Sequence, residues 1–469
     1  MRDKISINKV FLCVAFGFFL AIIGDYTDAP LKGWYILSVF VSIILSFILK
    51  AAPMSVSVLG GLFCLSLCEI TDLKEGLNSY ANSTVWLVLA AFILASSIIN
   101  SNLGKRIALF LIRIFGNSPL GLAYSICLTE LILAPVVPSN TARGGGIIAP
   151  IVNSLSNSLN SKADINPNKI GAFLILVGSH ANLISSAMFL TAMAANPLMA
   201  EGIKNILGID FNWSTWALGA IVPGIISLAL LPLLIYYIQK PQISSPINSK
   251  QIVVEEIKKI GKISYSEKII GAILIFLFLL WTSKSFHGIG TTEVAWLGVL
   301  LMLILKAEKW KNVLHNHMAW DTFIWLGGLL SLSVLMAKYG IIEWLVSNIR
   351  NISISSNELI VLIIIATLYF YSMYLFSMLT AHITAIAFPL MATALYFHAN
   401  PMITACLFAY FSCLCGCLTN YSTGPIIVYF GLGYVDNKKW YKTGFVVSIY
   451  HLFIWIVIGL LWWKFIGWW

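Results

Sequence analysis

Charged residues are scarce in this chain of 469 residues. Asp, Glu, Lys and Arg together make up 10% of it, whereas hydrophobic residues make up 59% and the mean hydropathy is +0.89. Soluble globular domains carry about 25% charged residues, so this composition excludes that class. It predicts a polytopic membrane protein instead.

The sequence also lacks the patterns of a disulfide framework, a metal centre or a catalytic site. All eight cysteines lie in apolar stretches, and the alternating cysteines at 413, 415 and 417 cannot gather three thiolates on one helix face. No nucleophile and base lie on adjacent turns of one predicted helix. We therefore expect no enzyme, no catalytic residue, no bound metal and no cofactor.

Apolar runs dominate what is present. Eleven are long enough to cross a hydrocarbon core of about 30 Å. They lie near 8–24, 33–50, 53–70, 84–101, 168–196, 214–238, 268–286, 291–306, 320–338, 401–430 and 443–467. Two further stretches, 118–158 and 357–398, carry polar motifs at their centres, so we interpret them as re-entrant hairpins.

The two halves of the chain resemble each other. Thr-Ala-Arg at 141–143, with a proline at 150, recurs as Thr-Ala-His at 380–382, with a proline at 389. Five predicted spans and one hairpin per half are an odd number of crossings, so the second copy should have inverted topology. The predicted fold is therefore all-α, with about 11 transmembrane helices and two re-entrant hairpins in two inverted-topology repeats. The predicted units are an N-terminal transmembrane helix at 1–30, repeat 1 at 31–238, a cytoplasmic linker at 239–267 and repeat 2 at 268–469.

Basic residues indicate the orientation. Lys and Arg are about three times as frequent in the loops on the N-terminal side of the predicted membrane as in those on the other side. By the positive-inside rule the N-terminus is cytoplasmic. The first span follows a basic leader but no small-residue cleavage pattern follows it, so we interpret it as a retained helix. We expect an integral protein of a bacterial inner membrane.

The first hairpin tip combines a helix stop with polar and flexible residues. Pro138 ends one arm, Ser139, Asn140 and Thr141 follow, and three glycines at 144–146 let backbone approach a bound group closely. Free backbone N–H groups at a helix N-terminus favour an anion. The first tip therefore predicts an anion site.

The second tip keeps Thr380 but has Met378 and Leu379 in place of the serine and asparagine. The two halves therefore differ in polar detail. We expect Thr380 to contact the substrate through its hairpin, with fewer side-chain oxygens than the first tip offers.

Arg143 and His382 occupy matching positions in the two tips. An arginine near the middle of a membrane costs about 3 kcal/mol or more unless it is paired or wet. A bound anion is one possible partner, and Glu130, thirteen residues earlier, is the other. The matching histidine favours the anion, so we predict that Arg143 and His382 neutralise the substrate.

Polar residues interrupt two long apolar runs, at 179–186 and at 417–425. We predict that both helices break there and that Asn182, Asn420 and Thr423 line the substrate site. The alternative is hydrogen bonding between packed helices.

Ser139-Asn140-Thr141, together with 380–382 and 418–425, resembles the divalent anion:sodium symporters. The closer resemblance is to the branch of 2-oxoglutarate/malate translocators and citrate/succinate antiporters. It implies a homodimer whose hairpins and broken helices move as an elevator. It also implies exchange of dicarboxylates such as 2-oxoglutarate, malate and succinate, with citrate as a further candidate, and no nucleic-acid partner.

The mode of coupling has two interpretations. Met378 and Leu379 remove oxygens that Na+-coupled relatives carry, and Arg143 and His382 could replace the charge of Na+. This favours Na+-independent exchange, because an empty carrier could not easily move an unpaired Arg143. The alternative is a Na+-coupled di/tricarboxylate symporter with Na+ near Ser139, Asn140 and Asn182. An intramembrane enzyme or a passive anion channel fits inverted repeats less well.

Overall fold

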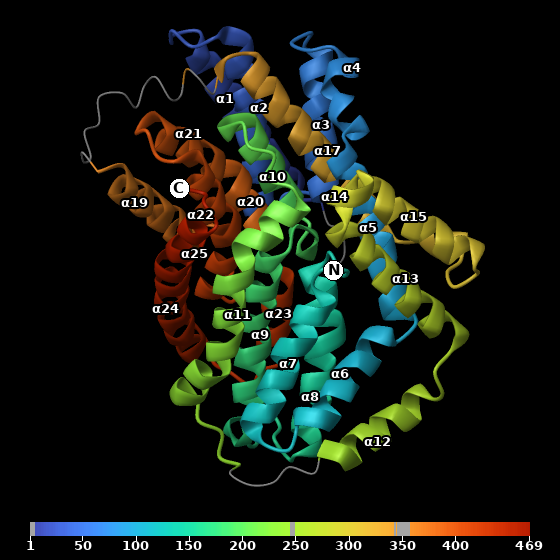
Figure 1. The fold of residues 1–469 in the computed structure, drawn as a ribbon. Helices are drawn as coiled ribbons and strands as arrows, with labels where there is room; N and C mark the ends of the chain where they lie inside the picture. Colours follow the sequence, from blue (N-terminus) through green and yellow to red (C-terminus); the bar gives the residue numbers. More distant parts are fainter. Residues whose placement is uncertain (1–4, 244–248, 342–343, 345–356) are drawn as a thin grey trace.

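The computed structural model describes residues 5–243, 249–341, 344 and 357–469. Every regular element in this described part is a helix (Figure 1). Eleven helical segments there are long and apolar enough to cross a membrane. They are α1 (Ile7–Gly24), α2 (Leu31–Leu49), α5 (Ser83–Asn100), α9 (Gly171–Met188), α11 (Trp213–Ile238), α13 (Tyr265–Thr282), α17 (His317–Lys338), Glu358–Leu375, Leu379–Tyr396, Pro401–Leu418 and Asn437–Phe465. The predicted all-helical membrane fold is confirmed.

Shorter helices complete this part of the chain. They are α3 (Met54–Leu67), α4 (Leu73–Gly76), α6 (Leu103–Phe115), α7 (Pro119–Leu133), α8 (Ala149–Ser158), α10 (Asn196–Leu207), α12 (Ser249–Ile260), α14 (Lys284–His287), α15 (Thr291–Ile304) and α16 (Trp310–Leu314). The four C-terminal long segments contain α19 (Glu358–Ser372), α20 (Leu379–His382), α21 (Phe388–Tyr396), α22 (Pro401–Leu414), α24 (Asn437–Phe453) and α25 (Gly459–Phe465). Helix α23 (Gly424–Gly431) lies between the last two of these segments. The predicted spans 53–70 and 291–306 are 14-residue helices, whereas both arms of the second hairpin reach 18 residues. Length alone therefore does not separate a span from a hairpin arm.

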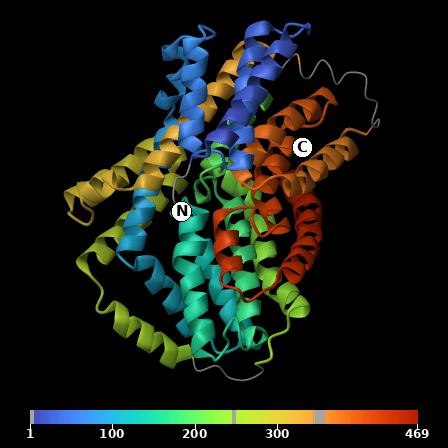
Figure 2. The same cartoon turned by 180° about the vertical axis from the view of Figure 1, so that it is seen from behind.

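The helices form two groups. Figure 1 and, from behind, Figure 2 show α1, α2, α3 and α17 together at one end of the molecule. At the other end, α7, α8, α11 and α23 surround α9, of which every residue is buried. The first hairpin belongs to the second group, and its tip lies next to α9. The second hairpin, α19 to α21, packs against α22 and also contacts α2 of the first group.

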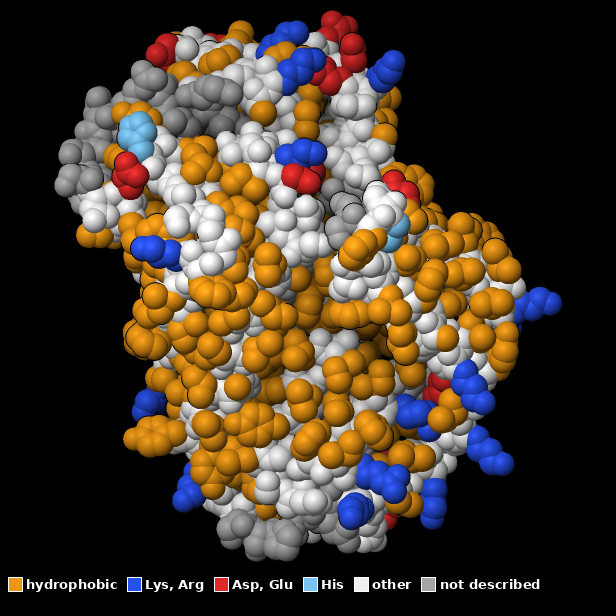
Figure 3. Space-filling model, viewed as in Figure 1, with side chains coloured by type: hydrophobic (Ala, Val, Ile, Leu, Met, Phe, Trp, Pro, Cys, Tyr) orange, Lys and Arg blue, Asp and Glu red, His pale blue; other side chains and the backbone are white. Residues whose placement is uncertain are grey.

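The surface agrees with a membrane protein. In Figure 3 apolar side chains cover the middle of the face shown, whereas Lys and Arg gather at the end that carries α12. Such a band between charged ends is typical of a chain whose middle contacts lipid.

The two hairpins share one local design. In the first, a π-helix (Thr141–Ile148) follows the tip and leads into α8, whose second residue is Pro150. In the second, α20 and a π-helix (Ile383–Ala387) lead into α21, whose second residue is Pro389. Proline lacks an N–H group, so the hydrogen bonds of the preceding turn must be rearranged, and wide π-turns accommodate this. The local match agrees with a repeat, and the inverted relation of the two halves stays a prediction.

The linker contains a helix that is fastened to the rest of the fold. Glu256 of α12 accepts hydrogen bonds from Lys105 of α6 at 2.8 Å, from Lys259 at 2.6 Å and from Ser154 of α8 at 3.3 Å. Hydrogen bonds from Lys105 and then Lys259 lower the pKa of Glu256 to about 2. Helix α12 thereby joins α6 to an arm of the first hairpin. Residues 244–248 of the predicted linker lie outside the described residues.

Candidate functional site

Both hairpin tips contact residues 422–424, where the non-helical stretch before α23 ends and α23 begins. The backbone N–H of Leu379 in the second tip donates to the carbonyl of Ser422 at 3.1 Å. Nδ2 of Asn140 in the first tip donates to Oγ1 of Thr423 at 3.2 Å. Thr141 lies against Gly424 so closely that a Cβ atom on this glycine would collide with it. Two tips from opposite halves of the chain thus meet at residues 422–424.

Three helical segments begin at this meeting point. Residues 141–158 and 379–396 are helical from the two tips onward, and α23 begins at Gly424. The first N–H groups of a helix lack partners within the helix and carry the positive end of its dipole. Three such ends around Thr423 favour a bound anion without requiring a charged side chain.

Two other predicted site residues, Ser139 and Asn182, form hydrogen bonds that stabilise the first tip. Oγ of Ser139 accepts the N–H of Ala142 at 3.1 Å, which starts the helical turn of the tip. Nδ2 of Asn182 on α9 donates to the carbonyl of Asn140 at 3.2 Å. Oδ1 of Asn182 is buried and has no hydrogen-bond partner among the described residues. Helix α9 therefore supports the tip and leaves one acceptor available beside it.

Arg143 is not available to a substrate in this structure. Its side chain is 0% exposed, and its Nε donates to Oε2 of Glu130 at 2.6 Å, with Glu130 also 0% exposed. The carboxylate accepts further bonds from Asn182 Nδ2 at 3.0 and 3.1 Å and from Ser185 Oγ at 3.0 Å. The predicted contact of Arg143 with the substrate is therefore not possible in this conformation, and the alternative partner Glu130 is the one observed.

The guanidinium instead bonds to two segments in which a helix has ended. Its Nη1 donates to the carbonyl of Val137, just before the tip, at 2.9 Å and to that of Ala192, just after α9, at 3.0 Å. Its Nη2 donates to Ser186 Oγ at 2.8 Å. Carbonyls freed where helices end need partners when they are buried. Arg143 supplies them, and the argument for exchange from an unpaired Arg143 does not hold for this conformation.

His382 is likewise turned into its own hairpin. Its side chain is fully buried, and its Nε2 lies 2.7 Å from Ser372 Oγ and 3.0 Å from the carbonyl of Tyr369. Its ring stacks on that of Tyr369 with centroids 4.5 Å apart. The prediction that His382 faces the substrate is therefore not met in this structure.

A signal for both pairings was present in the sequence. Glu130 precedes Arg143 by thirteen residues, and Tyr369 precedes His382 by the same number. The shift of 239 residues that relates the tips therefore also relates their partners. Each tip residue therefore has a partner at the same place in its own hairpin, although Glu130 offers its carboxylate and Tyr369 its backbone carbonyl.

The two interrupted helices behave differently. The second breaks as predicted, with Thr419–Thr423 outside any helix. The first does not break at 179–186, because α9 continues to Met188. Its serine hydroxyls bond to carbonyls of the same helix, for example Ser186 Oγ to the carbonyl of Asn182 at 2.6 Å. Hydroxyl groups satisfied in this way do not require a break.

Asn420 bonds to α24 and not to either tip. Its Nδ2 donates to Oδ1 of Asn437 in α24 at 2.7 Å, whereas Thr423 bonds to the first tip. That Asn420 lines the site stays a prediction. The predicted residues that the structure brings together at or behind the tips are Ser139, Asn140, Thr141, Asn182, Thr380 and Thr423.

Two hairpins that meet at a broken helix, within an apolar helical chain, define the class of secondary membrane transporters. Residues 4–469 match the model of the sodium:sulfate symporter transmembrane region. The chain belongs to this family, the divalent anion:sodium symporters, and is an integral membrane protein.

Curated relatives cover nearly the whole chain. YflS of Bacillus subtilis (strain 168), whose name presents it as a candidate malate transporter, is 37% identical over 100% of this chain and 98% of its own length. The chloroplastic dicarboxylate transporter 1 of Spinacia oleracea is 34% identical over 99% of this chain and 82% of its own length. The inner membrane protein YbhI of Escherichia coli (strain K12) is 32% identical over 99% of both chains.

Solved structures share the fold at low identity. The Alcanivorax borkumensis YdaH transporter matches with a TM-score of 0.58 and 11% identity, over 87% of this chain and 90% of that chain. Neisseria gonorrhoeae MtrF, described as one of a class of antimetabolite efflux pumps, matches with a TM-score of 0.55 and 13% identity, over 85% and 84%. At these identities the similarity concerns the fold alone.

Proposed function

We propose that this protein transports dicarboxylates and that the meeting point of the two tips is where they bind. The observation that carries the proposal is the convergence of three helix starts around Thr423. A small dianion has two carboxylates, and two tips from opposite halves can hold one each. The names of the relatives, which give malate and dicarboxylates, support this substrate class.

In this proposal the first tip holds one carboxylate through Asn140, Thr141 and the backbone N–H groups that follow Ser139. Thr380 and the amides of the second tip hold the other. Thr423 stands between them, bonded to Asn140. Arg143 and His382 act as positioning residues inside the hairpins, because both are buried with partners of their own.

The transport mode is part of the same proposal. The helices around α9, together with the second hairpin, move against the group around α17 as an elevator, and the protein works as a homodimer in a bacterial inner membrane with its N-terminus in the cytoplasm. Exchange is Na+-independent, because Met378 and Leu379 offer no side-chain oxygen where the first tip has Ser139 and Asn140.

One observation favours Na+-coupled symport as a second candidate. Oδ1 of Asn182 is buried beside the first tip without a hydrogen-bond partner in the described residues. Hard cations such as Na+ prefer oxygen ligands of this kind. A Na+ ion near Ser139, Asn140 and Asn182 would use it.

Counterflow in liposomes tests both candidates. Vesicles preloaded with malate, 2-oxoglutarate, succinate or citrate are given labelled malate in either sodium or choline buffer. The exchanger predicts accelerated uptake with dicarboxylates inside, equal in both buffers. Loss of uptake in choline would favour the symporter, and uptake indifferent to any preloaded carboxylate would contradict the proposal.

A further inference from the structure

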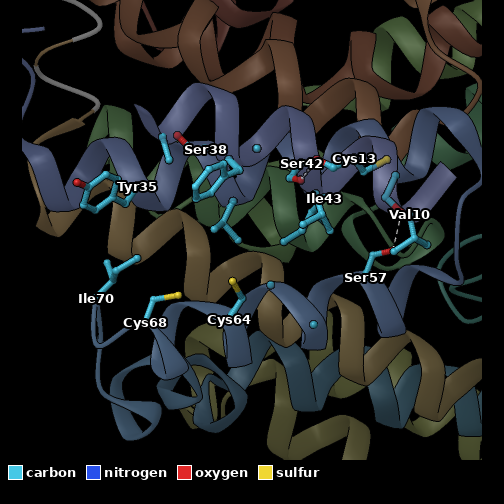
Figure 4. A pocket seen from close by; sticks show the side chains of 18 of the residues that line it. Val10, Cys13, Tyr35, Ser38, Ser42, Ile43, Ser57, Cys64, Cys68 and Ile70 are labelled. Atoms are coloured by element: carbon cyan, nitrogen blue, oxygen red, sulfur yellow. Dashed lines mark hydrogen bonds between the residues drawn. The ribbon is translucent and has the colours of Figure 1, made fainter. Parts of the chain in front are cut away.

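A groove of about 730 Å³ lies between α1 and α2 on one side and α3 on the other, and no residue of either hairpin lines it (Figure 4). It follows α1 from Val10 to Asp25, a length of about 22 Å at the rise of an α-helix. Carbon and sulfur atoms of Cys13, Ile43 and Cys64 are among its walls. Since these helices belong to the membrane part of the chain, the groove opens toward lipid.

The residues at the floor of the groove are almost fully buried. Cys13 is 3% exposed, Ile43 is 4% exposed and Ser46 is 6% exposed, although all three line it. A helix from another molecule is about 10 Å across and would rest on the rim. A single hydrocarbon chain is thin enough to reach the floor.

The serines in the walls are already satisfied within the protein. Ser42 Oγ donates to the carbonyl of Cys13 at 2.5 Å, and Ser38 Oγ donates to that of Trp34 at 2.9 Å. Ser46 and Ser57 bond to each other at 2.8 Å. These hydroxyls need no partner from a ligand, so an apolar occupant leaves no polar group unsatisfied.

The two ends of the groove differ in charge. Lys9 and Lys50 lie at the end lined by Val10 and Ala52, and Lys9 Nζ donates to the carbonyl of Leu49 at 2.9 Å. Neither lysine forms an ion pair with a described residue. Asp25 lines the opposite end. An anionic group therefore fits the lysine end better than the end that Asp25 lines.

We propose that this groove binds one acyl chain of an anionic phospholipid, with the phosphate of its headgroup between Lys9 and Lys50. This site is separate from the transport site and does not depend on the identity of the cargo. It makes the stability of the group around α17 sensitive to the lipid composition of the membrane.

Native mass spectrometry of the purified full chain tests the site, with phosphatidylglycerol and phosphatidylcholine of equal chain length as probes. Gly60→Leu fills the groove, because a Cβ atom at Gly60 has no neighbour within 4 Å. Gly271→Leu on α13 is the matched control, since its Cβ would first meet Leu103 at 3.9 Å, outside the groove. We expect Gly60→Leu to lower bound phosphatidylglycerol about tenfold and the control to leave it unchanged.

A second variant tests the headgroup. Lys9→Gln/Lys50→Asn removes both charges, and asparagine tolerates the left-handed backbone at position 50, where φ is 51°. We expect the preference for phosphatidylglycerol over phosphatidylcholine to fall about tenfold. Lys32→Gln/Lys74→Gln, beyond the other end of the groove, should keep it.

Three results would overturn the proposal. Gly60→Leu could retain wild-type amounts of phosphatidylglycerol, or the wild type could bind both lipids equally. Alternatively, Gly60→Leu could convert a dimer into monomers while the bound lipid stays unchanged. The groove would then be a contact between two copies of the chain.

Discussion

Neutralising Glu130 should destabilise the protein far more than neutralising an acid at the surface. Glu130→Gln keeps the shape of the side chain but leaves the Arg143 guanidinium charged and 0% exposed. Removing one partner of a buried ion pair costs about 3–5 kcal/mol. Bonds from Arg143 to Val137, Ala192 and Ser186 remain, so the loss should lie within this range.

Thermal unfolding in detergent, followed for both single variants and the double variant, measures the effect. Glu130→Gln/Arg143→Gln removes both charges, so it should be more stable than the sum of the single losses by about 2–3 kcal/mol. Glu75→Gln is the control, because its partner Lys338 is 58% exposed. An exposed pair of this kind contributes little to stability, because water screens it.

Transport assays on the same variants distinguish a structural role of Arg143 from direct contact with the substrate. If Arg143 only positions the tip, exchange should return in part in the double variant along with stability. Wild-type stability of Glu130→Gln, or strictly additive losses, would refute the reasoning. A fully stable Arg143→Gln without exchange would restore Arg143 as a substrate ligand.

Two further outcomes are expected. Gly424→Ala should lower exchange about tenfold, because its Cβ would strike Thr141 and overpacking costs about 1–3 kcal/mol. The control Gly431→Ala meets no atom within 4 Å and should exchange at the wild-type rate. Equal rates for the two variants in liposomes would contradict the tight contact. Glu256→Gln should increase hydrogen exchange in α12, whereas Glu255→Gln should not. In the wild type α12 should stay protected from pH 8 to 5.5, because the stabilisation by a carboxyl with a folded pKa of about 2 declines only as the pH falls from the unfolded value of about 4.3 toward 2. Loss of protection near pH 6 would contradict the pairing.

The helices and the places of the hairpins could be predicted from the sequence because both depend on local properties. Apolar runs mark the spans, and Pro138, Pro150 and Pro389 mark where helical hydrogen bonding must change. The break near Thr423 was predicted from the polar residues that interrupt the apolar run at 417–425.

The partners of the polar residues could not be predicted as well, because they depend on packing between distant segments. Arg143 had two possible partners. Only the fold shows that the hairpin arm with Glu130 runs alongside it, with Arg143 Nε 2.6 Å from Glu130 Oε2. The serines of α9 suggested a break, but bonds to their own helix carbonyls keep the helix intact. Asn420 and Thr423 are three residues apart, and the turn between them directs one to α24 and the other to the first tip.

Substrate protection of a cysteine at the meeting point tests the central proposal most directly. Thr423→Cys is labelled with a small maleimide in liposomes with and without malate, and mass spectrometry of the peptide separates it from the eight native cysteines. Binding between the tips predicts that malate slows labelling at position 423 in a saturable manner. Labelling that is unchanged by malate, in a variant that still exchanges it, would contradict a dicarboxylate site between the two hairpins.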